Sequence, residues 1–262
     1  MAITKWYRTD AKGRAPVVLG LPGFVQEDED TRIDYFLREF KEKHNINGMR
    51  LTWPNITFDQ ERKTIECRFK MDEYLTTLQE AIKELKADQH VDSDIVGVLA
   101  SSMSASVFAY HLASENTNFK CYTSICPMIG WNYFGNPPLR SNLERNPRNI
   151  PVSNYYDKQK GITRYIPASY LDQIIEVDAL EALKDYNKNG MNVMTIIGKQ
   201  DDVSNPESMR QYHKFLGGSE ANILEYDAGH DVNPNLCEDP IIRFFTSSLK
   251  KDFDPSILLK AG

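Results

Sequence analysis

The chain has 262 residues, of which 41% are hydrophobic and 26% are charged, a composition typical of a globular protein with one large α/β domain. Its formal net charge of −6 argues against a nucleic-acid partner, because phosphate binding needs a basic face. Neither residues 1–16 nor any later run has the apolar length of a signal peptide or a membrane span, so we expect a cytoplasmic protein.

Short β-type runs alternate with helix-type runs along the first half of the chain. The apolar run 15–24 predicts a strand that ends in a Pro-Gly loop, and residues 33–46 have the periodic apolar spacing of an amphipathic helix. This alternation predicts a mainly parallel sheet covered by helices. The other elements of this half are predicted over 48–54 (strand), 71–88 (helix), 94–100 (strand) and 119–127 (strand).

The alternation is interrupted after residue 127 by a stretch rich in aromatic residues, asparagine and proline. We therefore expect residues 1–127 and 188–262 to form one α/β core, into which residues 128–187 are inserted as a cap or lid. Within the second part of the core, elements are predicted over 191–198 (strand), 206–217 (helix), 221–227 (strand) and about 239–250 (helix).

A cluster of serines follows the predicted strand 94–100, in the run "ASSMSA". Small-x-Ser-x-small between a strand and a helix is the pattern of a nucleophile elbow. The central serine occupies a tight, strained turn there, so the residues two positions away on either side must be small. Ser102 fits this pattern best, with Ala100 and Ser104 as its flanking residues.

Ser101 and Ser104 are the alternative centres of the turn. Ser101 would have Leu99 as one flanking residue, which is too large for the close approach of strand and helix. Ser104 is permitted by size, but it would push the turn into residues that are better assigned to the helix. The run alone is also compatible with an ordinary turn that has no chemistry.

A serine nucleophile needs a base that accepts its proton and an acid that orients the base. Asp201 in "GKQDD" and His230 in "AGHD" each follow a predicted strand, in the chain order Ser, Asp, His of the elbow architecture. Both lie at the carboxyl end of a parallel strand, where open α/β sheets bind ligands. Asp202 is an alternative acid, either aspartate could instead cap the helix near Pro206, and His230 could be a solvated loop residue.

An anionic tetrahedral intermediate also needs two N–H donors aimed at its oxygen. The residue after the nucleophile supplies one of them, which makes the Met103 N–H a candidate. The second donor is expected from the loop after the first strand, "LPGF", where Gly23 permits close approach of the backbone and Phe24 supplies the N–H.

The segments "LPGF", "ASSMSA", "GKQDD" and "AGHD" together resemble the α/β-hydrolase superfamily over nearly the whole chain. This resemblance implies the α/β-hydrolase fold, with a mainly parallel central sheet, helices on both faces and a small cap insertion. It also implies Ser102 as nucleophile, Asp201 as acid, His230 as base, and the Phe24 and Met103 N–H groups as the oxyanion hole.

Within this superfamily, the elbow and the start of the cap are similar to the acyl-transferases of bacterial luminescence, which act as thioesterases on fatty acyl-carrier protein. Two features depart from the family pattern. No histidine precedes the glycine of the oxyanion loop, and the elbow contains no glycine.

The predicted activity is that of a serine hydrolase, which cleaves an ester or thioester of an apolar acyl group through an acyl-serine intermediate. The expected partner is a small-molecule acyl ester or thioester, with an acyl-carrier protein as a possible thioester donor. In the cap, Trp131, Tyr133 and Phe134 are candidates for contact with the acyl group, or for packing of the cap on the core.

Several alternatives to this activity stay open. The same three side chains could serve an acyltransferase, a peptidase or a C–C hydrolase, and the fold could also carry a binding protein without catalysis. The predicted reaction requires no cofactor. The four cysteines show neither CxxC nor metal-ligand spacing, which predicts reduced thiols and no metal site.

Overall fold

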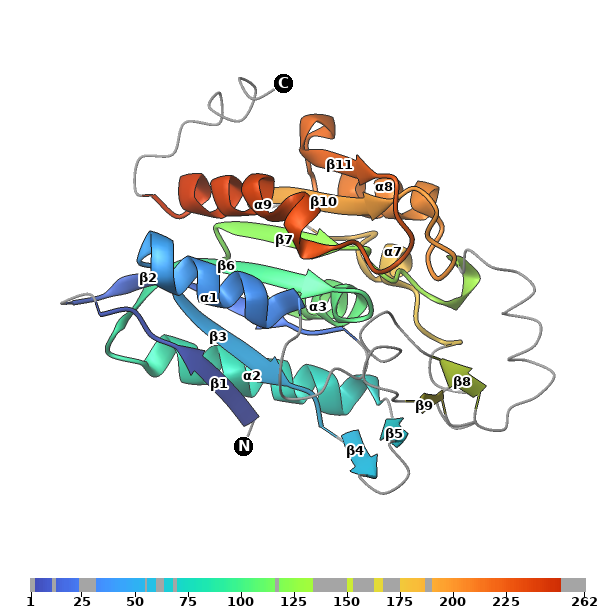
Figure 1. Cartoon of the computed structure of the whole chain (residues 1–262), viewed down its shortest axis with the longest axis horizontal. Coiled ribbons are helices and arrows are strands. Elements are labelled where there is room, and N and C mark those ends of the chain that lie inside the picture. Colours follow the sequence, from blue (N-terminus) through green and yellow to red (C-terminus); the bar gives the residue numbers. More distant parts are fainter. Residues whose placement is uncertain are drawn as a thin grey trace.

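The computed structural model describes residues 3–10, 13–23, 32–54, 56–59, 64–67, 70–115, 118–133, 150–152, 163–166, 175–186 and 190–250. Most of the described strands belong to one seven-stranded sheet (Figure 1). Neighbouring strands in it are parallel, except that the first strand runs antiparallel to its neighbour. Its order is β1 (Ile3–Tyr7), β3 (Asn47–Thr52), β2 (Ala15–Leu21), β6 (Val91–Ser101), β7 (Cys121–Ile125), β10 (Asn192–Gly198) and β11 (Ile223–Tyr226).

Helices cover both faces of this sheet (Figure 1), as the α/β prediction requires. On one face, α1 (Arg32–His44) packs against α9 (Pro234–Ser248). The other face carries α2 (Met71–Ala87), α3 (Ser104–Ser114), α7 (Ala179–Ala182) and α8 (Pro206–Phe215). Strands with helices on both sides are apolar on both sides, which explains the continuous hydrophobic runs in the sequence. The predicted α/β-hydrolase fold is therefore confirmed.

A second sheet of four strands is a feature that the sequence did not predict. Its order is β4 (Ile56–Asp59), β5 (Thr64–Cys67), β9 (Thr163–Ile166) and β8 (Ile150–Val152). It joins a hairpin that lies between β3 and α2 to a pair of strands from the stretch between β7 and β10. In Figure 1 it lies on the side of the molecule at which β6 and β7 end.

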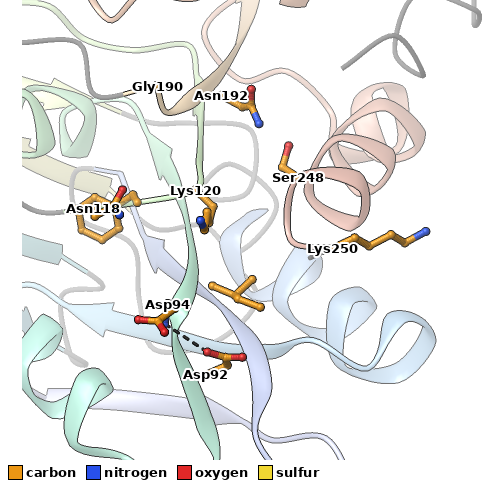
Figure 2. Close-up of a pocket in the computed structure, with 10 residues that line it drawn as sticks. Asp92, Asp94, Asn118, Lys120, Gly190, Asn192, Ser248 and Lys250 are labelled. Carbon is orange, nitrogen blue, oxygen red and sulfur yellow. Dashed lines mark hydrogen bonds between the residues drawn. The ribbon is translucent and has the colours of Figure 1, made fainter. Parts of the chain in front are cut away.

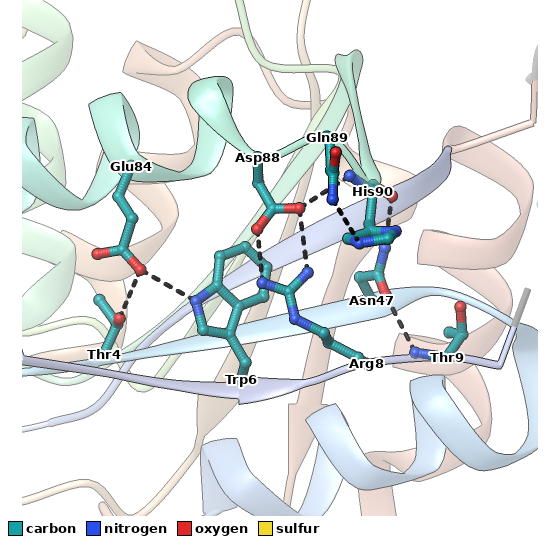
Figure 3. Close-up of polar contacts among 9 residues, drawn as sticks. All are labelled: Thr4, Trp6, Arg8, Thr9, Asn47, Glu84, Asp88, Gln89 and His90. Atoms are coloured by element: carbon teal, nitrogen blue, oxygen red, sulfur yellow. Dashed lines mark hydrogen bonds and ion pairs between the residues drawn. The ribbon is translucent and has the colours of Figure 1, made fainter. Parts of the chain in front are cut away.

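β1 is also a strand without a sequence prediction, and polar contacts attach it to α2 (Figure 3). Thr4 Oγ1 and Trp6 Nε1 donate hydrogen bonds of 2.8 and 3.0 Å to Glu84. The Arg8 guanidinium pairs with Asp88 through both terminal nitrogens and lies 4.1 Å from the centre of the Trp6 ring. These contacts fix β1, the edge strand of the sheet, against α2.

α9 begins at Pro234 rather than near residue 239, which corrects the predicted boundary. Asn233 is its cap, since the Asn233 side chain accepts a hydrogen bond of 3.0 Å from the Asn235 N–H. Proline at the first helical position needs no hydrogen-bond partner for its nitrogen, so the Asn-Pro pair was a usable start signal. Pro240 inside the helix removes one backbone hydrogen bond without ending it.

In the described part of the chain, no helix combines the length and the apolar character needed to cross a membrane.

His111, in α3, makes stability depend on pH. The ring is 1% exposed and packs against Phe108 and Phe119, with ring centroids 6.3 and 6.2 Å away. Burial lowers the pKa of His111 to about 4, and the charge of Lys86 acts in the same direction. Because the unfolded chain takes up this proton first as the pH falls, the free energy of unfolding should drop by about 2 kcal/mol between pH 7.5 and pH 5.

This prediction can be checked by urea unfolding at pH 7.5, 6 and 5. His111→Leu should remove about 2 kcal/mol of the pH dependence, whereas His44→Gln, at an exposed position, should leave the dependence as in the parent chain. Equal pH dependence in the parent and in His111→Leu would contradict the assignment.

Candidate active site

Ser102 lies between the end of β6 and the start of α3, in the left-handed backbone region with φ of +53°. This conformation is unfavourable for a residue with a side chain and persists only where the surroundings enforce it. The Ser102 N–H donates to the Ile125 carbonyl at 3.0 Å, and the Ser102 carbonyl accepts from the Met128 N–H at 3.0 Å. The chain after β7 therefore fixes this turn from both sides.

The structure brings together the three residues that the sequence singled out as nucleophile, base and acid. His230 Nε2 lies 2.8 Å from Ser102 Oγ, and His230 Nδ1 lies 2.8 Å from Asp201 Oδ2. The Asp201 side chain is fully buried, and the His230 side chain is 16% exposed. Ser102, which lies at the end of this chain of contacts, is 8% exposed.

The Asp201 carboxylate is oriented by the loop that follows β10. Its Oδ1 accepts hydrogen bonds from the Val203 and Ser204 N–H groups at 2.8 and 2.9 Å, which turns Oδ2 toward His230. Asp202 is exposed. Neither aspartate caps α8, because that cap is Asn205, whose side chain accepts from the Glu207 N–H at 2.8 Å. The geometry thus favours Asp201 over Asp202 as the partner of the imidazole.

Arg32, the first residue of α1, holds the loop that carries His230. It is a buried cation with 4% exposure, and its Nη1 donates to the His230 carbonyl at 3.2 Å. Its Nη2 lies 3.5 Å from Asp231 Oδ1. A buried guanidinium needs such partners to offset its lost hydration, so Arg32 and the histidine loop fix each other. Arg32 was not predicted as a site residue, since its partners lie 198 and 199 positions away along the chain.

The loop after β2 approaches Ser102 closely. A Cβ built on Gly23 would lie 3.3 Å from Ser102 Cβ, so glycine permits this approach. The preceding carbonyl, that of Pro22, accepts hydrogen bonds from Trp53 Nε1 at 2.7 Å and from Ser104 Oγ. Trp53 is itself stacked on Tyr74, with ring centroids 4.8 Å apart. Two buried donors therefore hold this loop against the first turn of α3.

The structure describes only one of the two residues that were predicted as oxyanion donors. Met103 is fully buried, directly after Ser102 at the start of α3. Phe24, the other predicted donor, lies outside the described residues. The residue before it, Gly23, is the last described position of the loop.

Of the three predicted substrate contacts, only the side chain of Tyr133 is described. It is partly buried against the core, and its hydroxyl donates to the Asp178 carboxylate at 3.2 Å. Its carbonyl accepts from the Asn205 N–H at 3.0 Å, next to the loop of Asp201. The contact with Asn205 attaches Tyr133 to the predicted core, whereas the contact with Asp178 joins two residues of the predicted insertion. The side chain of Trp131 and the whole of Phe134 lie outside the described part.

Cys126 is a neighbour of this site that the sequence analysis did not single out. It follows β7, has φ of +45°, and is fully buried. Its Sγ, one carboxylate oxygen of Asp201 and one ring nitrogen of His230 all lie within 4.8 Å of one another. Burial, followed by the charge of Asp201, raises the pKa of the Cys126 thiol to about 12. Its position at the end of β7, the neighbour of the strand that leads to Ser102, is the sequence signal by which it could have been predicted as a site residue.

A polar pocket lies at the opposite edge of the sheet, at the amino ends of the strands (Figure 2). Asp92 and Asp94 come from the start of β6, Lys120 precedes β7, and Asn192 opens β10. Ligands of open α/β sheets bind at the carboxyl ends of the strands. This pocket is therefore distinct from the group of Ser102, Asp201 and His230.

Comparison with known proteins shows the fold and no nearer relationship. No family model matches the chain, and no curated protein sequence matches it. The α/β hydrolase GrgF from Penicillium sp. sh18 superposes with a TM-score of 0.70 at 14% identity, over 94% of this chain and 92% of that one. DcsB in complex with its substrate analogue gives 0.68 at 15%, over 95% and 94%. Est1E from Butyrivibrio proteoclasticus with bound ferulic acid gives 0.67 at 12%, over 95% of both chains.

Gly198, at the end of β10, sets the distance between the two loops that carry Asp201 and His230. A Cβ at this position would lie 2.2 Å from the Gly229 carbonyl oxygen and 2.7 Å from that of Ala228, which are main-chain atoms. Gly198→Ala must therefore displace the histidine loop, and we expect a loss of about 1–3 kcal/mol in the free energy of unfolding.

Gly229→Ala is the matched control in the same loop, because its nearest contact would be the Gln200 carbonyl oxygen at an ordinary 3.7 Å. We expect this variant to change stability by less than about 1 kcal/mol. Thermal unfolding of both variants measures the difference, and equal losses would refute the role of Gly198.

Proposed function

Because the chain has the α/β-hydrolase fold, we propose that it is a serine hydrolase with Ser102 as nucleophile, His230 as general base and Asp201 as the acid. The observation that carries this proposal is the pair of 2.8 Å contacts from the two nitrogens of His230, one to Ser102 Oγ and one to Asp201 Oδ2. When a hydroxyl, an imidazole and a buried carboxylate are hydrogen-bonded in this order, the imidazole can activate the hydroxyl for attack on a carbonyl.

In the first half of the reaction, Ser102 Oγ attacks the carbonyl carbon of the substrate while His230 Nε2 takes the hydroxyl proton. Asp201 Oδ2 holds the Nδ1–H and stabilises the positive charge that the ring acquires. The carbonyl π electrons move to the oxygen, which becomes anionic. When the tetrahedral intermediate collapses, the alcohol or thiol leaves with the proton from Nε2, and the acyl group stays on Ser102 as an ester.

In the second half, water attacks the acyl-serine carbonyl and gives a proton to His230 Nε2. Collapse of the second tetrahedral intermediate breaks the bond to Ser102 Oγ, which takes the proton back from Nε2. The carboxylic acid is released and the enzyme returns to its starting state. The reaction steps described use only side chains of this chain and water.

We assign the main-chain N–H groups of Met103 and Phe24 as the donors that hydrogen-bond to the anionic oxygen. One such donor contributes roughly 3 kcal/mol to lowering the barrier, provided that it is held at the developing charge. The hydrogen bonds from Trp53 and Ser104 to the Pro22 carbonyl support this assignment, because they fix the loop that leads to Phe24. We assign Trp53 and Ser104 as positioning residues, and likewise Arg32 for the histidine loop.

The proposed substrate is a small-molecule ester or thioester of an apolar acyl group, and residues 128–187 are proposed as the cap over it. The aromatic residues at the start of this stretch, Trp131, Tyr133 and Phe134, suit an apolar acyl group. Est1E, which shares the fold, binds ferulic acid, an aromatic carboxylic acid. A carboxylic acid is also the product that ester cleavage by this chain would release. An acyl-carrier protein is the alternative source of a thioester.

Covalent labelling by a fluorophosphonate tests the nucleophile. We expect one adduct per chain, on Ser102 when mapped by mass spectrometry, and none in Ser102→Ala. Ser101→Ala is the control, because Ser101 Oγ has no hydrogen-bond partner among the described residues. A folded protein that never labels would instead support a binding protein without catalysis.

Turnover of p-nitrophenyl esters of graded chain length, measured beside acyl-thioesters, tests the acid and the substrate class. Asp201→Asn should lower kcat by roughly 10³ to 10⁴, because the amide favours the wrong imidazole tautomer. Asp202→Asn, at an exposed position, should stay within about threefold of the parent. The reverse ranking would move the acid by one residue, and cleavage of peptide substrates alone would replace the esterase proposal by a peptidase.

A further inference from the structure

The Cys126 thiol lies close to the contact between Asp201 and His230, and all three side chains are potential metal ligands. The three donor atoms lie within 4.8 Å of one another. Their positions follow β7, β10 and β11, neighbouring parallel strands that end at the same edge of the sheet. Cys126 and the Asp201 side chain are fully buried, while the His230 side chain is 16% exposed. An ion can therefore enter the group from the side on which His230 lies.

We infer that Cys126, Asp201 and His230 form a binding site for a divalent ion of the zinc type, and that the bound ion switches off the proposed serine hydrolase. A thiolate, an imidazole and a carboxylate are the three ligand types that zinc takes in proteins. The set also favours zinc over magnesium or calcium, which prefer oxygen ligands.

Charge supports the same assignment. A dication bound to one thiolate and one carboxylate gives a neutral group, which a buried position tolerates far better than a single unpaired charge. Oδ1 of Asp201 is already bonded to two main-chain N–H groups, so Oδ2 is the oxygen that faces the ion. The fourth tetrahedral position is left for a water molecule.

The geometry needs only a small adjustment. Tetrahedral zinc with bonds of about 2.0 to 2.3 Å separates its ligand atoms by roughly 3.3 to 3.6 Å. Asp201 Oδ2 and His230 Nδ1 are 2.8 Å apart, so they must separate by about half an ångström. The thiol, at no more than 4.8 Å, must move inward. Both are shifts of side chains that lie just beyond the carboxyl ends of the strands.

The proton balance explains why the ion inhibits. The Cys126 thiol loses its proton to solvent, and the Nδ1 proton of His230 moves to Nε2 when the ion takes Nδ1. Each ion therefore releases one proton. Nε2, now an N–H donor, can no longer accept the proton of Ser102, so the nucleophile loses its base. This inhibitory step rests on the proposed function, whereas the binding of the ion does not.

Cadmium titration of the full chain tests the binding, because a cadmium–thiolate bond produces an ultraviolet charge-transfer band. We expect a saturable band at one ion per chain, with one proton released and an apparent affinity that rises about tenfold per pH unit. Cys126→Ser should abolish the band, and His230→Ala should weaken affinity more than tenfold.

Cys121→Ser and Cys237→Ser are matched controls, since both are buried free thiols elsewhere in the fold, and Cys67→Ser covers the fourth cysteine. All three controls should keep the band. No band in the parent chain, or a band that persists in Cys126→Ser, would overturn the site.

Fluorophosphonate labelling in the presence of zinc tests the inhibition separately. Zinc should slow labelling of Ser102 at least tenfold, and a chelator should restore it, with each variant compared with its own metal-free rate. Cys126→Ser should lose this sensitivity. Binding without slower labelling would overturn the inhibitory role, whereas a chain that never labels yet shows the Cys126-dependent band would retain the site and lose the proposed function.

Discussion

The left-handed turn at Ser102 is the constraint on which the rest of the site depends. A serine with φ of +53° is strained, and main-chain hydrogen bonds to Ile125 and Met128 hold it there. Because these partners belong to the end of β7 and the chain after it, the turn is stabilised only where β7 lies beside β6. The position of Ser102 Oγ opposite His230 is thus a product of the assembled fold and not of the local run of serines.

The crowding of serines around this turn has a physical explanation in the structure. Ser104 and Ser106 are fully buried and donate to the carbonyl oxygens of Pro22 and Met128. One hydroxyl holds the loop after β2 and the other holds the chain after β7. Glycine would satisfy the size limit at Ser104 but would leave the Pro22 carbonyl with one donor fewer, which accounts for the absence of glycine at this position.

The core was predictable from the sequence because its strands are buried on both faces, which leaves long apolar runs, and the order Ser102, Asp201, His230 marked the strand ends. The missed features have weaker local signals. β4, β5, β8 and β9 are three or four residues long, too short for periodicity to distinguish them from loops. Arg32 and Cys126 were missed because the partners that give them meaning are distant in sequence and meet only through the topology.

The small sheet is built from two separate stretches of the chain, since β5 pairs in parallel with β9, Thr64 opposite Thr163. Exchange of the stretch between β7 and β10 for that of another protein would therefore also require exchange of the hairpin of β4 and β5. A chimaera that replaced only the stretch between β7 and β10 would leave the hairpin of β4 and β5 with an unsatisfied edge, inviting self-association of the product.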